Sequence, residues 1–172
     1  MGDKVYLLDS NVFIESFNLY YAFEFESKFW DRLLEFIEEK RIVILDKVRE
    51  ECTKRQDGLK DWFNEIDRAN DISSRTEAHV QGYGEVIQYL YESPYYTDAA
   101  VIAWSDEKVA DPWLIAVAKA NGYTLVTKEK RKGALNQNKP ASKPKIPNVG
   151  FDFDVEVIDL FDMMRELNFK LA

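Results

Sequence analysis

The chain has 172 residues, of which 46% are hydrophobic and 14% aromatic, and its formal net charge is −8. This length and composition predict one folded domain over residues 1–172 and exclude a disordered chain. The sequence has no apolar stretch of about 18 residues and no basic region followed by an apolar stretch and a cleavage site, so we expect neither a membrane span nor a secretory signal. The single cysteine, Cys52, excludes an internal disulfide, and we expect a reducing, cytoplasmic location.

Short apolar or β-branched runs alternate with stretches of helical periodicity along the chain. Strands are predicted at about residues 4–9, 41–45, 123–127 and 155–158. Helices are predicted at about residues 11–17, 28–40, 46–54, 59–69, 77–91, 99–104, 111–121 and from 159 onward. Residues 128–150 hold three prolines and many polar groups, which predicts a long loop. Strands that alternate with helices predict an α/β fold with a mostly parallel sheet.

Apolar residues at helical spacing define the helix faces that we expect to pack inward. They are Phe29, Leu33, Phe36, Ile37, Leu59, Trp62, Phe63, Ile66, Val80, Val86, Ile87, Leu90, Leu160, Phe161, Met164 and Leu167. Asp46 is predicted to cap the helix that follows the second strand, and Gly122 to end the helix that begins at Asp111. The lone His79 is not expected to be catalytic, and zinc-binding motifs are absent from the sequence.

Asp9 directly follows the apolar run Val5-Tyr6-Leu7-Leu8, and Ser10-Asn11 come next. This pattern is typical of a buried parallel strand with an acid at its carboxyl end. In open α/β sheets, ligands bind at that edge. Asp9 has an equally good interpretation as the N-cap of the next helix.

A second acid is expected on the helix after the second strand. At about 100° per residue, Glu51 lies beside the apolar stripe made by Val48 and Cys52, whereas Glu50 faces solvent. Glu51 can therefore reach inward, although a solvated helical Glu is the commoner fate of this residue type.

Two further acids lie next to predicted elements. Asp111-Pro112 is a common helix opening, with Asp as the cap and Pro at the first helical position, and this structural role is favoured by sequence alone. A carboxylate can, however, cap with one oxygen and offer the other to a metal. Glu129 lies two residues beyond Thr127, at the end of the third predicted strand, and is otherwise a loop acid among lysines.

The charge is unevenly distributed. Between Lys128 and Lys145, which we call the basic segment, seven basic residues accompany one acid, Glu129. A basic edge there, with Lys130, Arg131 and Lys132, could draw a phosphate backbone toward the acids. The alternative is a mobile, solvated loop, because its Asn, Gln, Ser and Pro residues favour disorder.

These motifs together resemble the successive motifs of PIN domains, and most closely a stand-alone prokaryotic, VapC-related group. The stretches that carry the resemblance are Val5–Asn11, Val48–Cys52, Ala110–Ala116, Leu125–Glu129 and Lys145-Ile146-Pro147, and Asp-Pro-Trp-Leu-Ile-Ala is the most specific of them. The resemblance implies a three-layer α/β/α fold with four to five strands and a Mg²⁺- or Mn²⁺-dependent ribonuclease, often the toxin of a toxin–antitoxin pair. It also implies RNA as substrate, an antitoxin partner and a homodimer. Many members have Asp or Asn where this chain has Glu129.

The implied chemistry fits the residue types. Carboxylate oxygens and water suit Mg²⁺ and Mn²⁺ rather than zinc. We expect Asp9, Glu51, Asp111 and Glu129 to form the catalytic metal site, with Ser10, Asn11 and Thr127 holding these carboxylates or a phosphate oxygen by hydrogen bonds.

Two rival functions remain open from the sequence. A haloacid-dehalogenase-type phosphatase also begins with Asp at the first strand end, but it needs a second Asp two residues on, where this chain has Asn11. The other rival is a catalytically weak PIN-like fold that acts as a protein-binding module; missing acids would indicate it, and here all four positions are filled.

Overall fold

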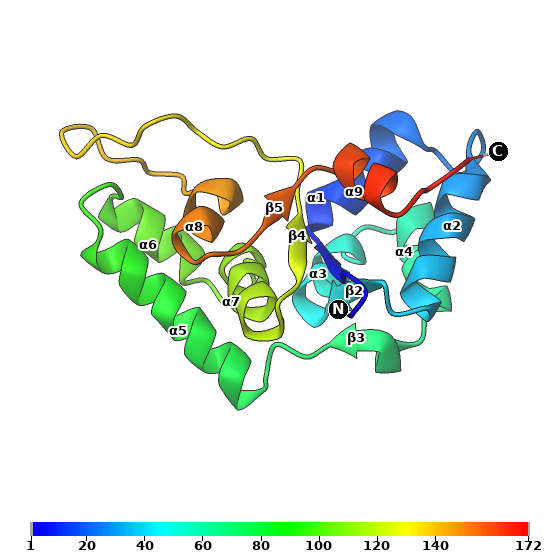
Figure 1. Cartoon of the computed structure of the whole chain (residues 1–172), viewed down its shortest axis with the longest axis horizontal. Coiled ribbons are helices and arrows are strands. Elements are labelled where there is room, and N and C mark those ends of the chain that lie inside the picture. Colours follow the sequence, from blue (N-terminus) through cyan, green and yellow to red (C-terminus); the bar gives the residue numbers. More distant parts are fainter. Residues whose placement is uncertain (1, 172) are drawn as a thin grey trace.

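The structure, a computed structural model, describes residues 2–171. Five strands form a parallel sheet in the order β3-β2-β1-β4-β5 (Figure 1). They are β1 (Tyr6–Leu8), β2 (Ile42–Leu45), β3 (Asp71–Ile72), β4 (Thr124–Val126) and β5 (Val157–Ile158). The predicted α/β fold is therefore confirmed, and the sheet is parallel throughout.

Nine α-helices within residues 2–171 flank this sheet, in keeping with three α/β/α layers. They are α1 (Ser10–Glu15), α2 (Ser27–Glu38), α3 (Asp46–Cys52), α4 (Gly58–Glu65), α5 (Glu77–Glu92), α6 (Asp98–Trp104), α7 (Asp111–Asn121), α8 (Ile146–Asp152) and α9 (Leu160–Glu166). A π-helix, η1 (Ser16–Tyr20), continues α1, and a 3-10 helix, η2 (Arg68–Asn70), precedes β3. Figure 1 shows α2 and α4 on one side of the sheet and α5, α7 and α8 on the other.

The order of the strands reverses at the centre of the sheet. Tyr6 of β1 lies opposite Ile42 of β2 on one side and opposite Thr124 of β4 on the other. The chain therefore adds β2 and β3 in one direction and β4 and β5 in the other. In open α/β sheets the crevice outside such a reversal is the usual ligand site. Here that crevice lies just beyond Leu8 and Val126.

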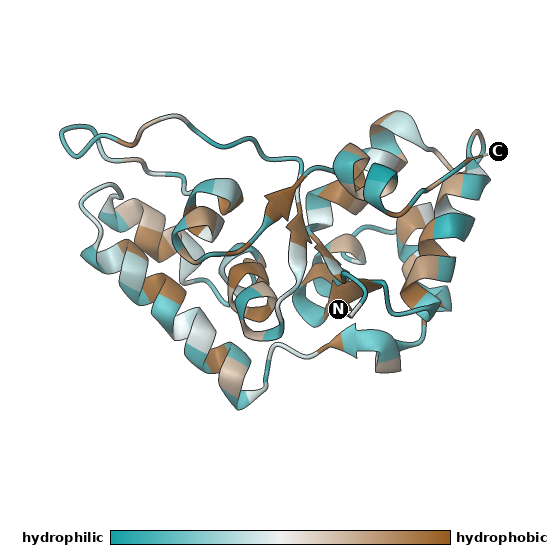
Figure 2. Cartoon of the chain, in the orientation of Figure 1, coloured by the Kyte–Doolittle hydropathy of each residue, from teal (hydrophilic) through white to brown (hydrophobic). Residues whose placement is uncertain are grey.

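Side chains of the three central strands form the middle of the core. Every residue of β1, β2 and β4 is buried, as expected for strands covered by helices on both faces. Figure 2 shows these strands as a hydrophobic centre between helices with polar outer faces. Helix α7 is buried from Pro112 to Ala118, so most of its motif is core. Within residues 2–171, no helix has the length and apolar character needed to cross a membrane.

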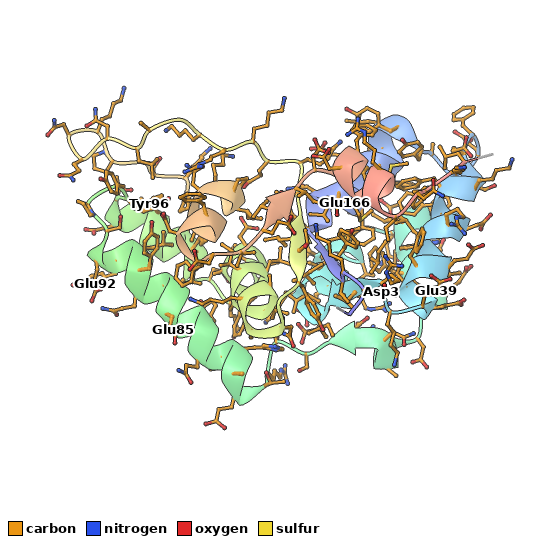
Figure 3. All side chains as sticks on the ribbon, in the orientation of Figure 1. Asp3, Glu39, Glu85, Glu92, Tyr96 and Glu166 are labelled. Atoms are coloured by element: carbon orange, nitrogen blue, oxygen red, sulfur yellow. The ribbon has the colours of Figure 1, made fainter. Side chains whose placement is uncertain are left out.

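Acidic side chains on the outer helices account for part of the negative charge. Glu85 and Glu92 lie on α5 and Glu39 follows α2, and all three are exposed. They project from the outer margins of the helical layers (Figure 3). This part of the charge is therefore separated from the central strand ends.

The observed elements and buried faces differ from the prediction at four points. The two-residue strand β3 was missed, and α8 begins inside the predicted loop 128–150 and extends to Asp152. Val80 and Phe161 were expected to face inward but are exposed, and Met163 takes the buried position on α9 instead. The buried set of α9 therefore follows residues 160, 163 and 167, a helical spacing displaced from the predicted one.

Candidate functional site

Asp9 lies where the sequence predicts, at the carboxyl end of β1 beside the reversal in strand order. Its backbone N–H donates to the carbonyl of Val126, so the β1–β4 pairing fixes its position. The side chain is 2% exposed, and Oδ2 accepts a hydrogen bond of 2.9 Å from the hydroxyl of Thr127. Asp9 precedes α1, but its carboxylate makes no cap hydrogen bond to that helix. The interpretation of its side chain as a simple N-cap is therefore not supported.

Glu51 reaches the same edge from α3. The hydroxyl of Ser10, the residue after Asp9, donates a hydrogen bond of 2.5 Å to Glu51 Oε2. Glu50 is exposed, while Val48 and Cys52 are buried. The helical geometry thus turns Glu51 inward and Glu50 outward, as the spacing predicts.

Asp111 is the first residue of α7, the helix that precedes β4 in the chain. Ala110 occupies the N-cap position, and no side-chain cap hydrogen bond is present there. The predicted cap role for the Asp111 carboxylate is therefore wrong, because the acid sits one position further into the helix. Pro112 has the first-turn place expected for it. The carboxylate is consequently available for another purpose.

Burial and mutual repulsion raise the pKa values of two of these acids. Burial, together with repulsion from the carboxylates of Glu129 and Glu51, raises the pKa of Asp9 to about 6, against the opposing effects of the hydrogen bonds from the Thr127 hydroxyl and the backbone of Asn11. Burial likewise raises the pKa of Asp111 to about 7, with added repulsion from Asp9, Glu129 and Glu51. We call these four side chains the acidic centre. They come from four separate parts of the chain, and the fold gathers them at one edge.

Glu129 is the member of this centre with the most hydrogen-bond partners. Its Oε2 accepts 2.7 Å from the backbone N–H of Ile146 at the start of α8, and Oε1 accepts 3.3 Å from the ammonium of Lys145. Its own N–H donates to the Thr127 hydroxyl. Both carboxylate oxygens are therefore engaged in holding α8 against the end of β4.

The donor set fits a hard divalent cation better than any other group. As the side chains stand, no three Asp, Glu, His or Cys residues within 2–171 are spaced to hold an ion together. Mg²⁺ usually keeps several waters and needs only one or two protein carboxylates, so it does not require such a cage. Asp9 and Asp111 carry raised pKa values because burial and repulsion disfavour their charge. A cation between them would offset both effects.

The three polar residues expected to support the acids divide into two groups. Ser10 and Thr127 are buried and bind Glu51 and Asp9 respectively, as proposed from the sequence. Asn11 is exposed, and it lines an adjoining hollow of about 590 Å³ together with Lys128 and Lys145. Its place is thus on the approach to the acids, not behind them.

Two lysines near the acidic centre were given no individual role from the sequence. Lys145 binds Glu129 and lowers the pKa of Asp111. Lys128 pairs with Glu15 at 2.6 Å and lies 4.1 Å from the ring centre of Tyr20. Tyr20 ends the π-helix η1, and no sequence periodicity predicts that helix. The contact between Lys128 and Tyr20 therefore could not be predicted from the sequence.

The basic segment is held at several points along its length. Lys130, Arg131 and Lys132 are exposed. The backbone of Lys132 exchanges two hydrogen bonds of 2.9 Å with the side-chain amide of Asn148. Ala141 makes backbone hydrogen bonds to Tyr95 and Thr97. These ties fix the path of the segment beside the acidic centre.

The comparisons with known proteins identify a family without a described activity. No curated protein and no solved structure matches the chain. A family model with the description "Domain of unknown function (DUF4411)" matches residues 6–171, and thus contains every residue of the acidic centre. The chain belongs to the DUF4411 family.

Proposed function

We propose that the protein is a Mg²⁺- or Mn²⁺-dependent endoribonuclease of PIN-like type. The observation that carries this proposal is the convergence of Asp9, Glu51 and Asp111 at the reversal in strand order, with none of the three carboxylates used as a helix cap. Buried carboxylates that repel one another destabilise a fold unless they serve a function or a cation.

When bound, the cation would polarise the scissile phosphate and lower the pKa of an attacking water. Asp9 and Asp111 are the residues that would hold it. Thr127 fixes the Asp9 carboxylate through Oδ2. Ser10 fixes Glu51, whose remaining oxygen can accept a proton from the water that attacks phosphorus. Glu129, tied to Lys145 and Ile146, would act at longer range through water.

The activity can be tested with a labelled RNA and protein stripped of metal with EDTA. We expect no cleavage in EDTA, and cleavage after Mn²⁺ or Mg²⁺ is restored. Asp9→Asn and Glu51→Gln should lower the rate at least about 100-fold, because each removes charge at the reaction centre. Glu50→Gln is the matched control on the same helix and should cleave at the wild-type rate. Full activity in EDTA, or equal losses in Glu50→Gln and Glu51→Gln, would reject the mechanism.

The partners belong to the same proposal. The PIN-like resemblance supports a toxin role in the cytoplasm, with a small antitoxin encoded nearby, and a homodimer. Co-expression of the neighbouring reading frame should suppress cleavage, and light scattering should give twice the monomer mass. A clean monomer at all concentrations would rule out the dimer. Binding of the neighbouring protein without cleavage of any RNA would indicate the binding-module alternative.

A further inference from the structure

Three adjoining hollows lie along the first half of the basic segment. The first, of about 590 Å³, borders the acidic centre at Glu129. The second, of about 410 Å³, shares the stretch Lys128–Lys130 with it. The third, of about 570 Å³, shares Arg131 with the second and continues to Leu135. Residues 128–135 can span up to ~26 Å when extended, so the three hollows follow one line of chain away from the acids.

Each hollow has at least one aromatic ring at its wall. Tyr20 and Phe161 line the first and are 55% and 46% exposed. Phe151 lines the second and is 59% exposed, with the Arg131 guanidinium 4.1 Å from its ring centre. Tyr95, half-buried, lines the third. Rings exposed along a groove are the arrangement on which successive unpaired bases stack.

The unpaired charge along this line is positive. Lys130, Arg131 and Lys132 are exposed, and none of them forms an ion pair with any of residues 2–171. Phosphate groups bind to such lysines and arginines and release counterions as they do so.

The acids that line the same hollows already have partners inside the protein. Glu15 pairs with Lys128, and Glu129 pairs with Lys145. Asp152 accepts a hydrogen bond from the Tyr89 hydroxyl. Asp159 caps α9, and Asp162 pairs with Arg165. These partners reduce the repulsion that the acids would otherwise exert on a polyanion.

We propose that the three hollows form a binding track for single-stranded nucleic acid, with bases stacked on Tyr20 or Phe161, on Phe151 and on Tyr95. The basic side chains hold the phosphates between these stations. Bases within a duplex are already stacked on one another and cannot cover the rings, so the track discriminates against duplexes. An acidic peptide would use the charges but not the rings. Binding of single strands by the track does not depend on the proposed function. Only the statement that the track leads the strand to a cleavage site rests on it.

The test is fluorescence anisotropy in EDTA with a ten-nucleotide oligouridylate, the matching oligothymidylate, a duplex of equal length and polyglutamate as competitor. We expect single strands to bind more tightly than the duplex; preference for the ribo- or deoxyribo-oligomer identifies the sugar. Phe151→Ala and Tyr95→Ala should each weaken single-strand binding about tenfold, with the salt dependence unchanged. Lys130→Ser with Lys132→Ser should instead reduce the salt slope, by about 0.7 for each phosphate that the protein no longer neutralises.

Phe25→Ala is the matched control, because Phe25 is 82% exposed and lines none of the three hollows. Equal binding of duplex and single strand, or equal effects of Phe151→Ala and Phe25→Ala, would overturn the track. The track would also be overturned if polyglutamate displaced the oligonucleotide while Phe151→Ala and Tyr95→Ala left binding unchanged. That result would assign the surface to an acidic protein partner. Single-strand binding without metal-dependent cleavage would leave the track standing and refute the nuclease. Metal-dependent cleavage in which Phe151→Ala leaves KM unchanged would refute the track and leave the nuclease proposal standing.

Discussion

Asp111→Asn should stabilise the metal-free protein at neutral and alkaline pH. Burial, and then the repulsion from Asp9, Glu129 and Glu51, raise the pKa of Asp111 from 3.8 to about 7. The native state therefore binds more protons than the unfolded state between about pH 4 and pH 7. The stability that protonated Asp111 contributes is present below pH 4 and is lost as pH rises through 7. About three pKa units correspond to about 4 kcal/mol in total, and about 2 to 3 kcal/mol of it is lost between pH 5 and pH 8.

Asn has nearly the same size as Asp and carries no charge, so the variant does not lose stability in this way as the pH rises. The difference in unfolding free energy between Asp111→Asn and wild type should increase by about 2 to 3 kcal/mol from pH 5 to pH 8 in EDTA. Urea denaturation at the two pH values measures it, with the exposed acid of Asp31→Asn on α2 as a control that should show no such trend. In Mn²⁺ the advantage should shrink, because only the wild type gains stability from the ion. If the difference in unfolding free energy between Asp111→Asn and wild type did not change with pH in EDTA, the reasoning that the charge on Asp111 destabilises the native state would be refuted.

Four further substitutions test the supports of the site and the fold. Thr127→Val removes the donor to Asp9 and should cost about 1 to 2 kcal/mol in urea denaturation and slow RNA cleavage; unchanged values would show that this hydrogen bond positions nothing. Asp71→Ala removes two hydrogen bonds, of 2.6 and 2.7 Å, from the buried Arg49 guanidinium and leaves it only the bond to the Phe63 carbonyl, so it should lower the unfolding free energy by about 3 to 5 kcal/mol. A loss below about 1 kcal/mol would contradict the buried ion pair. Gly122→Ala should cost about 1 kcal/mol because Gly122 has φ +69°, whereas Gly84→Ala, within α5 and open to solvent, should stabilise by a similar amount.

The central elements were predictable because their sequence patterns are strong. The runs that became β1 and β2 are apolar throughout, and β4 is apolar except for Thr124, as is typical of strands covered on both faces. Gly122 ends α7 in the left-handed conformation that the sequence indicates. Strand β3 is two residues long and carries no periodicity, so pairing with β2 alone defines it. Helix α8 was obscured by Pro147, although proline is well tolerated in a first helical turn.

The positions of the acids were harder to predict than their identity. Asp46 was expected to cap α3, but it is the first residue of that helix. Its Oδ1 accepts a hydrogen bond from the N–H of Lys47 in the same helix, and its Oδ2 accepts hydrogen bonds from both the N–H and the hydroxyl of Ser74. Asp111 is displaced from its expected cap by the same single residue. At the first helical position a carboxylate oxygen can bind a group outside the helix, as Asp46 Oδ2 binds Ser74. Local sequence does not determine such a shift.

Contacts between residues far apart in the chain could not be predicted from local sequence patterns. The pairing of Ser10 with Glu51 and of Lys145 with Glu129 depends on how helices pack at the carboxyl edge. The role of Val80 was misjudged because α5 packs on α7 through a close approach of Gly82 to Ala116, which turns Val80 to solvent. Only the packed structure determines which helix face is covered.

The most direct test of the metal centre is calorimetric titration of Mn²⁺ into protein stripped of metal. We predict saturable binding to the wild type, loss of that binding in Asp9→Asn and Asp111→Asn, and a smaller effect of Glu129→Gln, because Glu129 is already bound by Lys145 and Ile146. The exposed Glu50→Gln should bind as the wild type does. Absence of Mn²⁺ binding to the wild type, or unchanged binding by folded Asp9→Asn protein, would contradict the claim that these carboxylates form a metal centre.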